Sequence, residues 1–593
     1  MLEFPSYKRV GFYLSSFIFL LIVTIYMFYS ISENKPLWLK PSISPYDKFR
    51  NAAVVSENLL CSEIGRNIMF EGGNSIDAAV AIQICIGVTN FHSSGIGGGF
   101  FMVFYEQKTK KCITINAREA APLQSSKTMY INETENSLIG WKSIGVPGEI
   151  HGLWTAYKKY GSKKVSWSKL LEPSINLAYN GFPISQSLET FIEIRSKQLE
   201  NFPELKEYLT NPITKQYYKD GDIMKRPSLA KTLQELAYSN DPTYLFYKGK
   251  IGRIISRDIT QNGGYITLQD LSEYFSIVDD DPILVDSLGN NLTMCGCKPP
   301  SGFIVTQSII SIINEKYKRK KKIDIDNPKL WHRIIETQKF AYAQRTKLGD
   351  MNFVETAEFI MNYMKSDKFI KKVLNDLPEK AQNLKYYTND LYFDPLDNGT
   401  SHLSVIDNEG NAVSLTSTIN REFGSLCLSK ELGIVWNDQM DDFSSPNYSN
   451  SFGYPPSPSN FILPKKRPMS SMSPMIIYNN FTGKVRLVIG ASGGSYIISS
   501  VAQTTIRNLI FNQTIKEAVD APRFHNQFIP SKTKVEYGVP DSITTILQVK
   551  NHQTLMKIPK LKNHVAALEK TEDGFIYGAT DPRLTIHNYP TGF

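Results

Sequence analysis

The sequence predicts an α+β protein that is preceded by one transmembrane helix. Residues 150–380 follow helical patterns, whereas the chain from Thr400 onward opens with alternating strand patterns. Near the N-terminus, residues 10–32 contain no charged side chain. At 593 residues, 41% of them hydrophobic and 21% charged, the chain can bury a large core and does not have the composition of a disordered protein.

The apolar segment at residues 10–32 predicts an uncleaved signal-anchor helix. Its 23 residues are long enough to span a bilayer, and a cleaved signal peptide would have a shorter apolar stretch before a small-X-small site. Positive residues flank it on both sides, so the positive-inside rule gives only weak evidence for the orientation of the helix. We expect a cytoplasmic tail at residues 1–9, a stalk at residues 33–50, and a type II protein whose body is extracellular or lumenal, most simply at the plasma membrane.

Sequons and cysteines indicate an exported body. Six Asn-X-Ser/Thr sequons and an even number of cysteines, six, fit an oxidising compartment. The sequon at Asn398 overlaps a second motif, discussed below. The other candidate glycosylation sites are Asn132, Asn291, Asn447, Asn480 and Asn512.

Charge and metal-ligand patterns exclude two classes of partner. The net charge of +9 is spread over the whole chain, and the one dense basic run, residues 316–322, is typical of a solvated helix end or loop. We therefore expect no nucleic-acid partner. The cysteines and histidines are scattered without the spacing of a metal site, and no metal is expected.

Two helices and a glycine-rich turn open the body. The stretch "CSEIGRNIMFEGG" predicts a helix that stops at Gly72 and Gly73, and "SIDAAVAIQICIGVTN" predicts a buried helix with Ser75 and Asp77 as capping candidates. Residues 93–105, "SSGIGGGFFMVFY", predict a turn that leads into a strand. No Lys-Ser/Thr follows, so this is not a phosphate loop; the glycines allow close backbone packing instead.

The second half of the chain contains one long helix and two hairpins. Residues 331–350, "WHRIIETQKFAYAQRTKLGD", predict an amphipathic helix ended by Gly349. A polar stretch before Thr400 predicts an exposed loop. After it, "TSHLSVID" and "NAVSLTSTIN" form one expected hairpin, and "MSPMIIYNN" and "KVRLVIGASGG" form another. Thr400 is thus the last residue of a loop and the first of a strand.

The stretch "NGTSHLSV", residues 398–405, has two interpretations. Thr400 either completes a surface sequon or becomes a new N-terminus whose hydroxyl is a nucleophile activated by its own α-amine. The unperturbed pKa of an α-amine is about 7.7–8.0, so a useful fraction is a neutral base at physiological pH. Gly399 leaves its carbonyl open to attack. The glycines of "GASGGS", Gly493 and Gly494, offer backbone N–H groups for an oxyanion hole.

The motifs together resemble the gamma-glutamyltransferase family, also called gamma-glutamyl transpeptidases or glutathione hydrolases. "TSHLSVIDNEGNAVSLTSTIN", "NDQMDDFSSP", "RPMSSMSP" and "GASGG" resemble its small subunit, and "SSGIGGGFFMVFY", "INAREAAP", "SIGVPGEIHGLW" and "ETQKFAYAQRTKLGD" its large subunit. The resemblance covers nearly everything from Asn51 onward. It implies the N-terminal nucleophile fold, an αββα sandwich of two stacked, mainly antiparallel sheets flanked by helices.

The resemblance also implies processing and residue roles. Cleavage between Gly399 and Thr400 would give a large subunit, residues 51–399, and a small catalytic subunit, residues 400–593, which stay together as a heterodimer. Thr400 matches the catalytic threonine and Thr418 the threonine that hydrogen-bonds it, while the oxyanion hole falls on Gly493 and Gly494. The expected ligands of the substrate's α-carboxylate are Arg118, Ser470 and Ser471, and those of its α-ammonium are Asn420, Gln439 and Asp442.

A disulfide between Cys61 and Cys85 is a further implication of the resemblance, whereas the states of Cys112, Cys295, Cys297 and Cys427 stay open. Three departures stand out. Gln439 stands where some animal members have Glu, but others carry Gln, so binding should survive. The segment Arg421, Glu422 and Phe423 differs from the family near the acceptor side, which puts acceptor preference in doubt. The C-terminus departs after "DPR", with no expected catalytic consequence.

The reaction implied has two steps and no cofactor. Thr400 attacks the γ-amide carbonyl of glutathione or another γ-glutamyl compound, and water or the amine of an amino acid or dipeptide then accepts the γ-glutamyl group. One alternative is an uncleaved, catalytically silent surface homologue acting in binding or assembly, against which the joint presence of Thr400, Arg118 and Asp442 argues. Another is an acylase of the same fold. The residues Arg118, Asp442, Ser470 and Ser471 argue against it, because they match a free amino-acid end.

Overall fold

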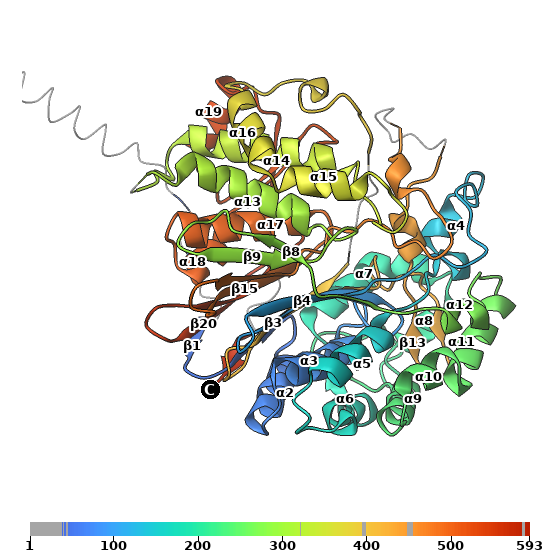
Figure 1. Cartoon of the computed structure of the whole chain (residues 1–593). Helices are drawn as coiled ribbons and strands as arrows, with labels where there is room; N and C mark the ends of the chain where they lie inside the picture. The colour runs from blue at the N-terminus through green and yellow to red at the C-terminus, as the bar shows by residue number, and fades with distance from the viewer. Residues whose placement is uncertain are drawn as a thin grey trace, which may run out of the picture.

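The computed structural model describes residues 38, 41–42, 46–320, 322–393, 399–446, 455–583 and 588–593. Two seven-stranded sheets lie face to face at its centre, and helices cover both outer faces (Figure 1). The layers therefore run helix, sheet, sheet, helix. This is the αββα sandwich that the sequence predicts.

Both sheets combine strands from the two sides of residue 400. In the first sheet the order is β1-β20-β19-β15-β14-β9-β8. Its strands are β1 (Tyr46–Phe49), β8 (Ile283–Val285), β9 (Leu292–Gly296), β14 (Met475–Asn479), β15 (Val485–Ser492), β19 (His564–Lys570) and β20 (Ile576–Thr580). In the second sheet the order is β21-β2-β10-β11-β3-β4-β7. Its strands are β2 (Ala53–Ser56), β3 (Gly99–Glu106), β4 (Lys111–Ala117), β7 (Ile277–Asp279), β10 (Ser401–Ile406), β11 (Ala412–Thr418) and β21 (Thr591–Gly592). All neighbours within these two sheets are antiparallel.

Three shorter ladders lie outside the sandwich. Their strands are β5 (Phe182–Pro183) with β6 (Ile223–Met224), β12 (Leu428–Ser429) with β13 (Ile434–Val435), and β16 (Phe524–His525) with β17 (Thr533–Glu536) and β18 (Leu555–Ile558).

Each sheet has its own helical layer. The helices on the side of the first sheet are α13 (Phe303–Tyr317), α14 (Pro328–Arg345), α15 (Ala357–Met364), α16 (Asp367–Asp376), α17 (Tyr496–Thr505), α18 (Ile515–Asp520), α19 (Asp541–Val549) and the π-helical turn η5 (Ile506–Ile510). Those on the side of the second are α2 (Leu59–Phe70), α3 (Ser75–Thr89), α4 (Glu135–Leu138), α5 (Glu149–Tyr160), α6 (Trp167–Asn180), α7 (Gln186–Leu199), α8 (Pro203–Tyr208), α9 (Pro227–Ala237), α10 (Pro242–Tyr247), α11 (Lys250–Gln261) and α12 (Leu268–Ser272). Short 3₁₀ turns are η1 (Trp141–Ser143), η2 (Leu384–Tyr386), η3 (Gln439–Asp442) and η4 (Pro458–Asn460).

His402 lies between the two sheets and fixes how they meet. Its Nδ1 lies 2.8 Å from the Thr416 hydroxyl and its Nε2 3.0 Å from the Ser404 hydroxyl. Burial lowers the pKa of His402 to about 3, so the ring is neutral. A Cβ on Gly490 of the facing strand β15 would lie 2.3 Å from this ring. Only glycine therefore lets the ring fit there.

Most predicted elements are confirmed, and two are corrected. Both hairpins form, as β10 with β11 and β14 with β15. The N-cap of α3 is Asn74, not Ser75, and Asp77 completes a capping box from the third helical position. The predicted amphipathic helix, α14, begins at Pro328 and ends at Arg345, before Gly349. It is buried on nearly every side because α13, α19 and β16 all pack against it.

The N-terminal predictions are only partly covered by the structure. The predicted span, residues 10–32, lies outside the described residues, and within them no helix has the length and apolar character needed to cross a membrane. The predicted stalk, residues 33–50, is shorter than expected, because Tyr46–Phe49 pair with β20 at the edge of the first sheet. The run at residues 316–322 is an exposed helix end and loop, as predicted, over its described residues.

The sequons divide into two groups. The side chains of Asn132, Asn291, Asn480 and Asn512 are exposed, as a glycan acceptor must be. Asn398 and Asn447 lie outside the described residues. Glycosylation itself stays a prediction.

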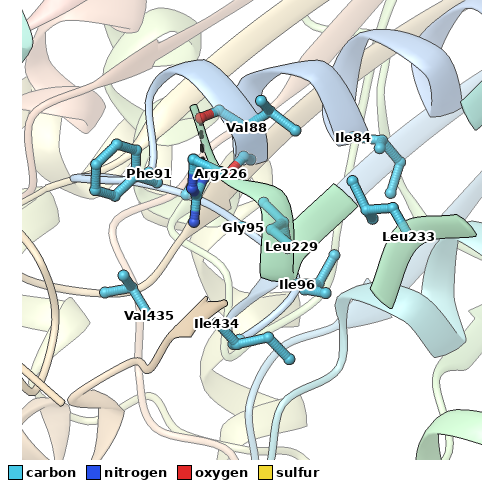
Figure 2. Close-up of a pocket in the computed structure, with 13 residues that line it drawn as sticks. Ile84, Val88, Phe91, Gly95, Ile96, Arg226, Leu229, Leu233, Ile434 and Val435 are labelled. Atoms are coloured by element: carbon cyan, nitrogen blue, oxygen red, sulfur yellow. Dashed lines mark hydrogen bonds between the residues drawn. The ribbon is translucent and has the colours of Figure 1, made fainter. Parts of the chain in front are cut away.

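The glycine-rich turn packs tightly, as predicted. A Cβ on Gly98 would lie 2.2 Å from the carbonyl oxygen of Thr418. Figure 2 shows the cavity that Gly95 and Ile96 line, and its volume of about 10 Å³ leaves no room for a nucleotide. In the same view the buried Arg226 donates to the carbonyl oxygens of Gly87 and Val88 at the end of α3, at 2.7 and 2.9 Å. Arg226 thus supplies hydrogen bonds to carbonyl groups that have no partner within the helix.

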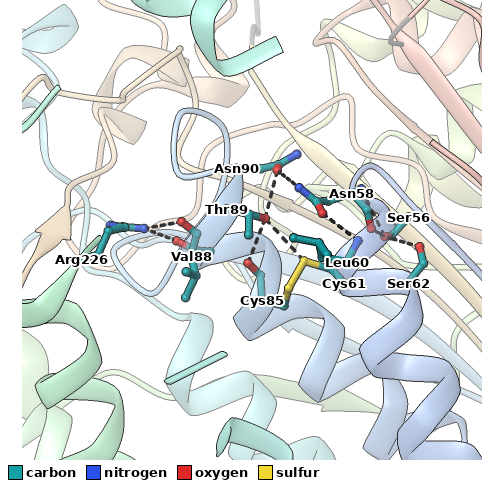
Figure 3. Close-up of a disulfide and its surroundings, with 11 residues drawn as sticks. Ser56, Asn58, Leu60, Cys61, Ser62, Cys85, Val88, Thr89, Asn90 and Arg226 are labelled. Carbon is teal, nitrogen blue, oxygen red and sulfur yellow. Dashed lines mark hydrogen bonds between the residues drawn. A yellow bond between two sulfur atoms is a disulfide. The ribbon is translucent and has the colours of Figure 1, made fainter. Parts of the chain in front are cut away.

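Two disulfides are present among the described cysteines. Cys61–Cys85, expected from the resemblance, joins α2 to α3 (Figure 3). Cys112–Cys295 was left open by the sequence and joins β4 of one sheet to β9 of the other. Cys297 and Cys427 are buried free thiols.

We expect Cys112→Ser to lower the free energy of unfolding by about 2–4 kcal/mol, because the cross-link restricts the unfolded chain. Urea unfolding of chains that also carry Thr400→Ala, and so are expected to stay uncut, followed by tryptophan fluorescence, measures the change. Cys427→Ser is the matched control, since it replaces a buried sulfur without cutting a covalent link. Equal losses in the two variants would contradict a stabilising role for the inter-sheet disulfide.

Candidate active site

Gly399 and Thr400 lie where β10 begins, and the backbone leaves no room for a larger residue before the threonine. A Cβ on Gly399 would lie 2.4 Å from the carbonyl oxygen of Asn420. The Thr400 hydroxyl contacts the carbonyl oxygen of Gly399. Thr418, at the end of β11, donates its own hydroxyl hydrogen to that carbonyl at 2.9 Å. Both hydroxyls predicted to matter therefore converge on the predicted scissile carbonyl.

Asn420 follows Thr418 in a strained turn. Its φ is +71°, and Phe423 three residues later has a φ of +61°, a region that bulky side chains rarely adopt. The backbone N–H of Asn420 donates to the Thr418 hydroxyl at 2.8 Å, and its amide nitrogen donates to the carbonyl of Asp438 at 3.1 Å. The amide oxygen of Asn420 is buried and accepts no hydrogen bond from the described residues. Strain of this kind concentrates at functional sites.

Arg118 and Asp442, predicted to bind opposite ends of a substrate, form a buried ion pair with each other. Arg118 is 1% exposed and also donates from Nε to the carbonyl of Pro468 at 3.0 Å. Gln439, on the same 3₁₀ turn as Asp442, donates to its carboxylate at 2.6 Å. An α-amino-acid end carries the charges complementary to both members of this pair.

Ser470 and Ser471 lie beside this pair and are anchored from two directions. The backbone N–H of Ser470 donates to Pro300 at 2.8 Å. Arg345, at the end of α14, donates to the Ser471 hydroxyl at 3.2 Å. One turn earlier on α14, the Tyr342 hydroxyl donates to the carbonyl of Ser495 at 2.7 Å. Helix α14 thus ties the serine pair to the chain just after the predicted oxyanion hole.

Gly493 and Gly494 form the turn between β15 and α17. Their φ values are +106° and +60°, which glycine adopts without strain. A Cβ on Gly493 would also lie 2.3 Å from the carbonyl oxygen of Lys562. Ser492 directly precedes these glycines, and Ser401 directly follows the nucleophile. Hydrogen bonds from both serines favour the charged form of Glu57. Burial nevertheless raises the pKa of Glu57 to about 8. The glycine turn and the start of β10 therefore share one buried neighbour.

Two further buried acids lie beneath these residues, and sequence reasoning did not single them out. Glu119 follows Arg118, and neither carboxylate oxygen accepts a hydrogen bond from the described residues. Burial raises its pKa to about 8, against the opposing charge of Arg118. Glu149 at the start of α5 also has its pKa raised to about 8 by burial. It accepts a hydrogen bond from Gln83 at 2.9 Å, and Gln83 also donates to Ser417 at 2.8 Å.

Comparison with known proteins decides the family. The gamma-glutamyltranspeptidase family model matches residues 61–589. The chain belongs to the gamma-glutamyltranspeptidase family. It is 36% identical over 549 residues to glutathione hydrolase proenzyme 1 of Schizosaccharomyces pombe, covering 90% of this chain and 83% of that protein. It is also 36% identical over 553 residues to Scoloptoxin SSD14 of Scolopendra dehaani, covering 93% of each.

Structural comparison agrees with this family's fold. The crystal structure of cephalosporin acylase from Bacillus halodurans matches with a TM-score of 0.79 over 92% of this chain and 96% of that chain. At 21% identity, this likeness shows the fold alone. Membership of this family, together with the likeness to glutathione hydrolases, identifies the chain as an enzyme.

The predicted residues other than Gly493 and Gly494 form a chain of contacts. It runs from Gly399 through Thr418 and Asn420 to the carbonyl of Asp438, directly before the turn of Gln439 and Asp442. Arg118 pairs with Asp442 and donates to the carbonyl of Met469, directly before Ser470. The sequence missed Arg345 as a partner of Ser471, although it lies inside the quoted motif "ETQKFAYAQRTKLGD". A positive charge at the last turn of that helix was the available signal.

Replacing Glu149 with Gln should stabilise the protein at high pH. Burial raises the pKa of Glu149 in the folded state to about 8, above the value of 4.5 for an unperturbed glutamate. Glu149 therefore costs the wild type stability as pH rises from about 4.5 to 8. We expect Glu149→Gln to exceed the wild type by a few kcal/mol above pH 8 and to match it below pH 4.5. Urea unfolding between pH 4 and 9, with both chains also carrying Thr400→Ala so that they stay uncut, measures the difference.

Glu193→Gln, on the exposed face of α7, is the control, because it removes one carboxylate without touching the core. If the difference between Glu149→Gln and the wild type did not vary with pH, Glu149 would not be held in its neutral form by burial.

Proposed function

We propose that this protein is a membrane-anchored glutathione hydrolase and gamma-glutamyltransferase that cuts its own chain between Gly399 and Thr400. The observation that carries the proposal is the convergence of the Thr400 and Thr418 hydroxyls on the Gly399 carbonyl, next to the Arg118–Asp442 pair. The relative from Schizosaccharomyces pombe carries the name proenzyme, which fits a chain that matures by cleavage.

The geometry supports self-cleavage. Attack of the Thr400 hydroxyl on the Gly399 carbonyl places negative charge on the carbonyl oxygen. Thr418 already donates a hydrogen bond to that oxygen at 2.9 Å, so the charge develops against a placed donor. The peptide bond then becomes an ester on the Thr400 oxygen, and water hydrolyses it. Thr400 is left with a free α-amine.

The mature enzyme uses this amine as a base. The amine takes the hydroxyl proton of Thr400 as the oxygen attacks the γ-amide carbon. The N–H groups of Gly493 and Gly494 receive the developing oxyanion. The amine next protonates the departing nitrogen, and cysteinylglycine leaves when glutathione is the donor. Water, or an amino-acid or dipeptide amine, repeats the sequence in reverse and removes the γ-glutamyl group.

The donor is recognised by its free amino-acid end. Arg118, with Ser470 and Ser471, takes the α-carboxylate, and Asp442, with Gln439 and Asn420, takes the α-ammonium. The amide oxygens of Asn420 and Gln439 accept no hydrogen bond within the described part of the chain. They support this assignment, because buried acceptors require donors such as an ammonium group. An acylase for amides without such an end would have no use for the buried pair. A silent homologue would have no use for the two converging hydroxyls.

Thr400→Ala should abolish processing. A denaturing gel of deglycosylated protein from animal cells should show two bands for the wild type and one full-length band for the variant. Thr400→Ser keeps a hydroxyl and should still give two bands, which separates loss of the nucleophile from misfolding. A single full-length band in the wild type would overturn the proposed cleavage.

Arg118→Lys should lower kcat/KM for γ-glutamyl donors by about 10- to 100-fold, because Lys keeps the charge but loses the planar fork that grips a carboxylate. Hydrolysis of γ-glutamyl-p-nitroanilide measures the effect, and normal processing into two bands serves as the folding control. An unchanged kcat/KM in a processed variant would remove Arg118 from the substrate site.

A further inference from the structure

Arg421 begins the segment in which this chain departs from its family, and its side chain is mostly buried. The side chain is 14% exposed, and its Nε donates to the carboxylate of Asp438 at 2.6 Å. The backbone N–H of Arg421 donates to the other oxygen of the same carboxylate at 3.0 Å. Asp438 is fully buried. One arginine therefore supplies hydrogen bonds to both oxygens of a buried acid, and the bond from its guanidinium is charge-assisted.

The Arg421–Asp438 pair joins the two segments that carry the proposed ligands of the donor's α-ammonium group. Asn420 directly precedes Arg421, and the turn η3, with Gln439 and Asp442, directly follows Asp438. The amide nitrogen of Asn420 also donates to the carbonyl of Asp438 at 3.1 Å. The ion pair thus links the segments within one residue of a proposed ligand on either side.

The same guanidinium holds a third segment, from the predicted large subunit. Its Nη2 donates to the carbonyl of Leu138 at the end of α4, and α4 packs against η3. Two residues later, the backbone N–H of Gly140 donates to the carbonyl of Ser425 at 2.9 Å. The Nε of Arg421 also lies 3.8 Å from the carboxylate of Asp441 within η3. Arg421 therefore fixes its own turn against both α4 and η3.

The turn that Arg421 belongs to has a strained backbone. The φ values of Asn420 and Phe423, on either side of it, are +71° and +61°. Conformations of this kind persist only where the surrounding contacts outweigh their cost. The side-chain contacts of Arg421 lie inside this turn and supply such a restraint. Without them, the turn could relax, and the side chain of Asn420 would move with it.

Arg421 must act on the donor through other residues. A guanidinium does not bind an ammonium group, because the two positive charges repel each other. Its effect therefore passes through Asn420 and through the turn that carries Gln439 and Asp442. Hydrogen bonds weaken steeply when their geometry departs from linear. A small shift between the two segments would therefore weaken their joint grip on an ammonium group.

We propose that Arg421 is a positioning residue for the donor. By binding Asp438, it holds Asn420 against the turn η3 and so sets the affinity of the enzyme for the α-ammonium group of γ-glutamyl compounds. The inference rests on the proposed function. The departure at residue 421 then affects the donor, whereas the sequence pattern pointed to the acceptor.

Arg421→Met tests the proposal, because Met keeps an apolar stem but loses the charge. We expect KM for γ-glutamyl-p-nitroanilide to rise about 10-fold while kcat changes less than about twofold, since a group remote from the reacting carbon is bound alike in the ground and transition states. Glutaryl-p-nitroanilide, which lacks only the α-amine, is the matched substrate. Measured with enzyme in excess, its kcat/KM should change less than about twofold.

A second variant separates positioning from stability. Arg421→Met leaves the buried carboxylate of Asp438 without this cation, which destabilises the protein. Adding Asp438→Asn removes the charge and should restore part of the lost Tm, while KM stays at least about threefold above the wild type. Lys339→Met is the matched control, because it breaks the buried pair with Glu336, at 2.7 Å on α14. It should lower Tm without raising KM.

The outcomes distinguish this inference from the proposed function. An unchanged KM in Arg421→Met, or a KM that returns to the wild-type value in the double variant, would overturn the inference alone. An equal loss of kcat/KM for both anilides would do the same, because it would indicate a general distortion of the site. A wild type that cleaves neither anilide would instead remove the proposed function, and this inference with it.

Discussion

The close approach of two backbones at Gly399 is the constraint on which the site depends. The carbonyl of Asn420 occupies the space that a side chain at position 399 would need. The same approach brings Thr418 within hydrogen-bonding distance of the Gly399 carbonyl. The turn that supplies the Asn420 carbonyl has positive φ values at Asn420 and Phe423. Packing, strain and the position of the nucleophile thus meet at one contact.

The layered fold was predicted through the resemblance to a known family, and the candidate residues named with it lie near one another in the structure. Contiguous patterns can be recognised in a sequence. Here they are turn glycines, alternating strands, and the motifs around Thr400, Arg118 and Asp442. The Cys112–Cys295 disulfide could not be predicted, because it depends on how β4 and β9 face each other across the sandwich. Helix α14 was misjudged for a similar reason. Its polar residues are buried in ion pairs and hydrogen bonds, as when Lys339 binds Glu336 at 2.7 Å.

The buried acids illustrate the same limit in the site itself. A carboxyl in a sequence such as "NARE" or "PGE" looks like a surface residue or a helix cap. In the fold, Glu119 and Glu149 lie in the core, where desolvation favours the neutral acid. Nothing in their neighbours along the chain shows this, because the burial comes from elements far apart in sequence. The burial of Glu119 and Glu149 is apparent only in the assembled sandwich.

Strands from either side of residue 400 mix in both sheets, which has a consequence for the lifetime of the enzyme if the chain is cut as proposed. A cut at Gly399 leaves β10 and β11 paired between β2 and β3, and β14 and β15 between β9 and β19. The two fragments are interleaved in both sheets, so neither can leave without dismantling the whole sandwich. Their separation is governed by an unfolding barrier, not by an ordinary dissociation equilibrium. The uncut chain can find its fold as a single molecule, whereas separated fragments would first have to meet. A cleaved molecule that has unfolded would thus not refold as the uncut chain does.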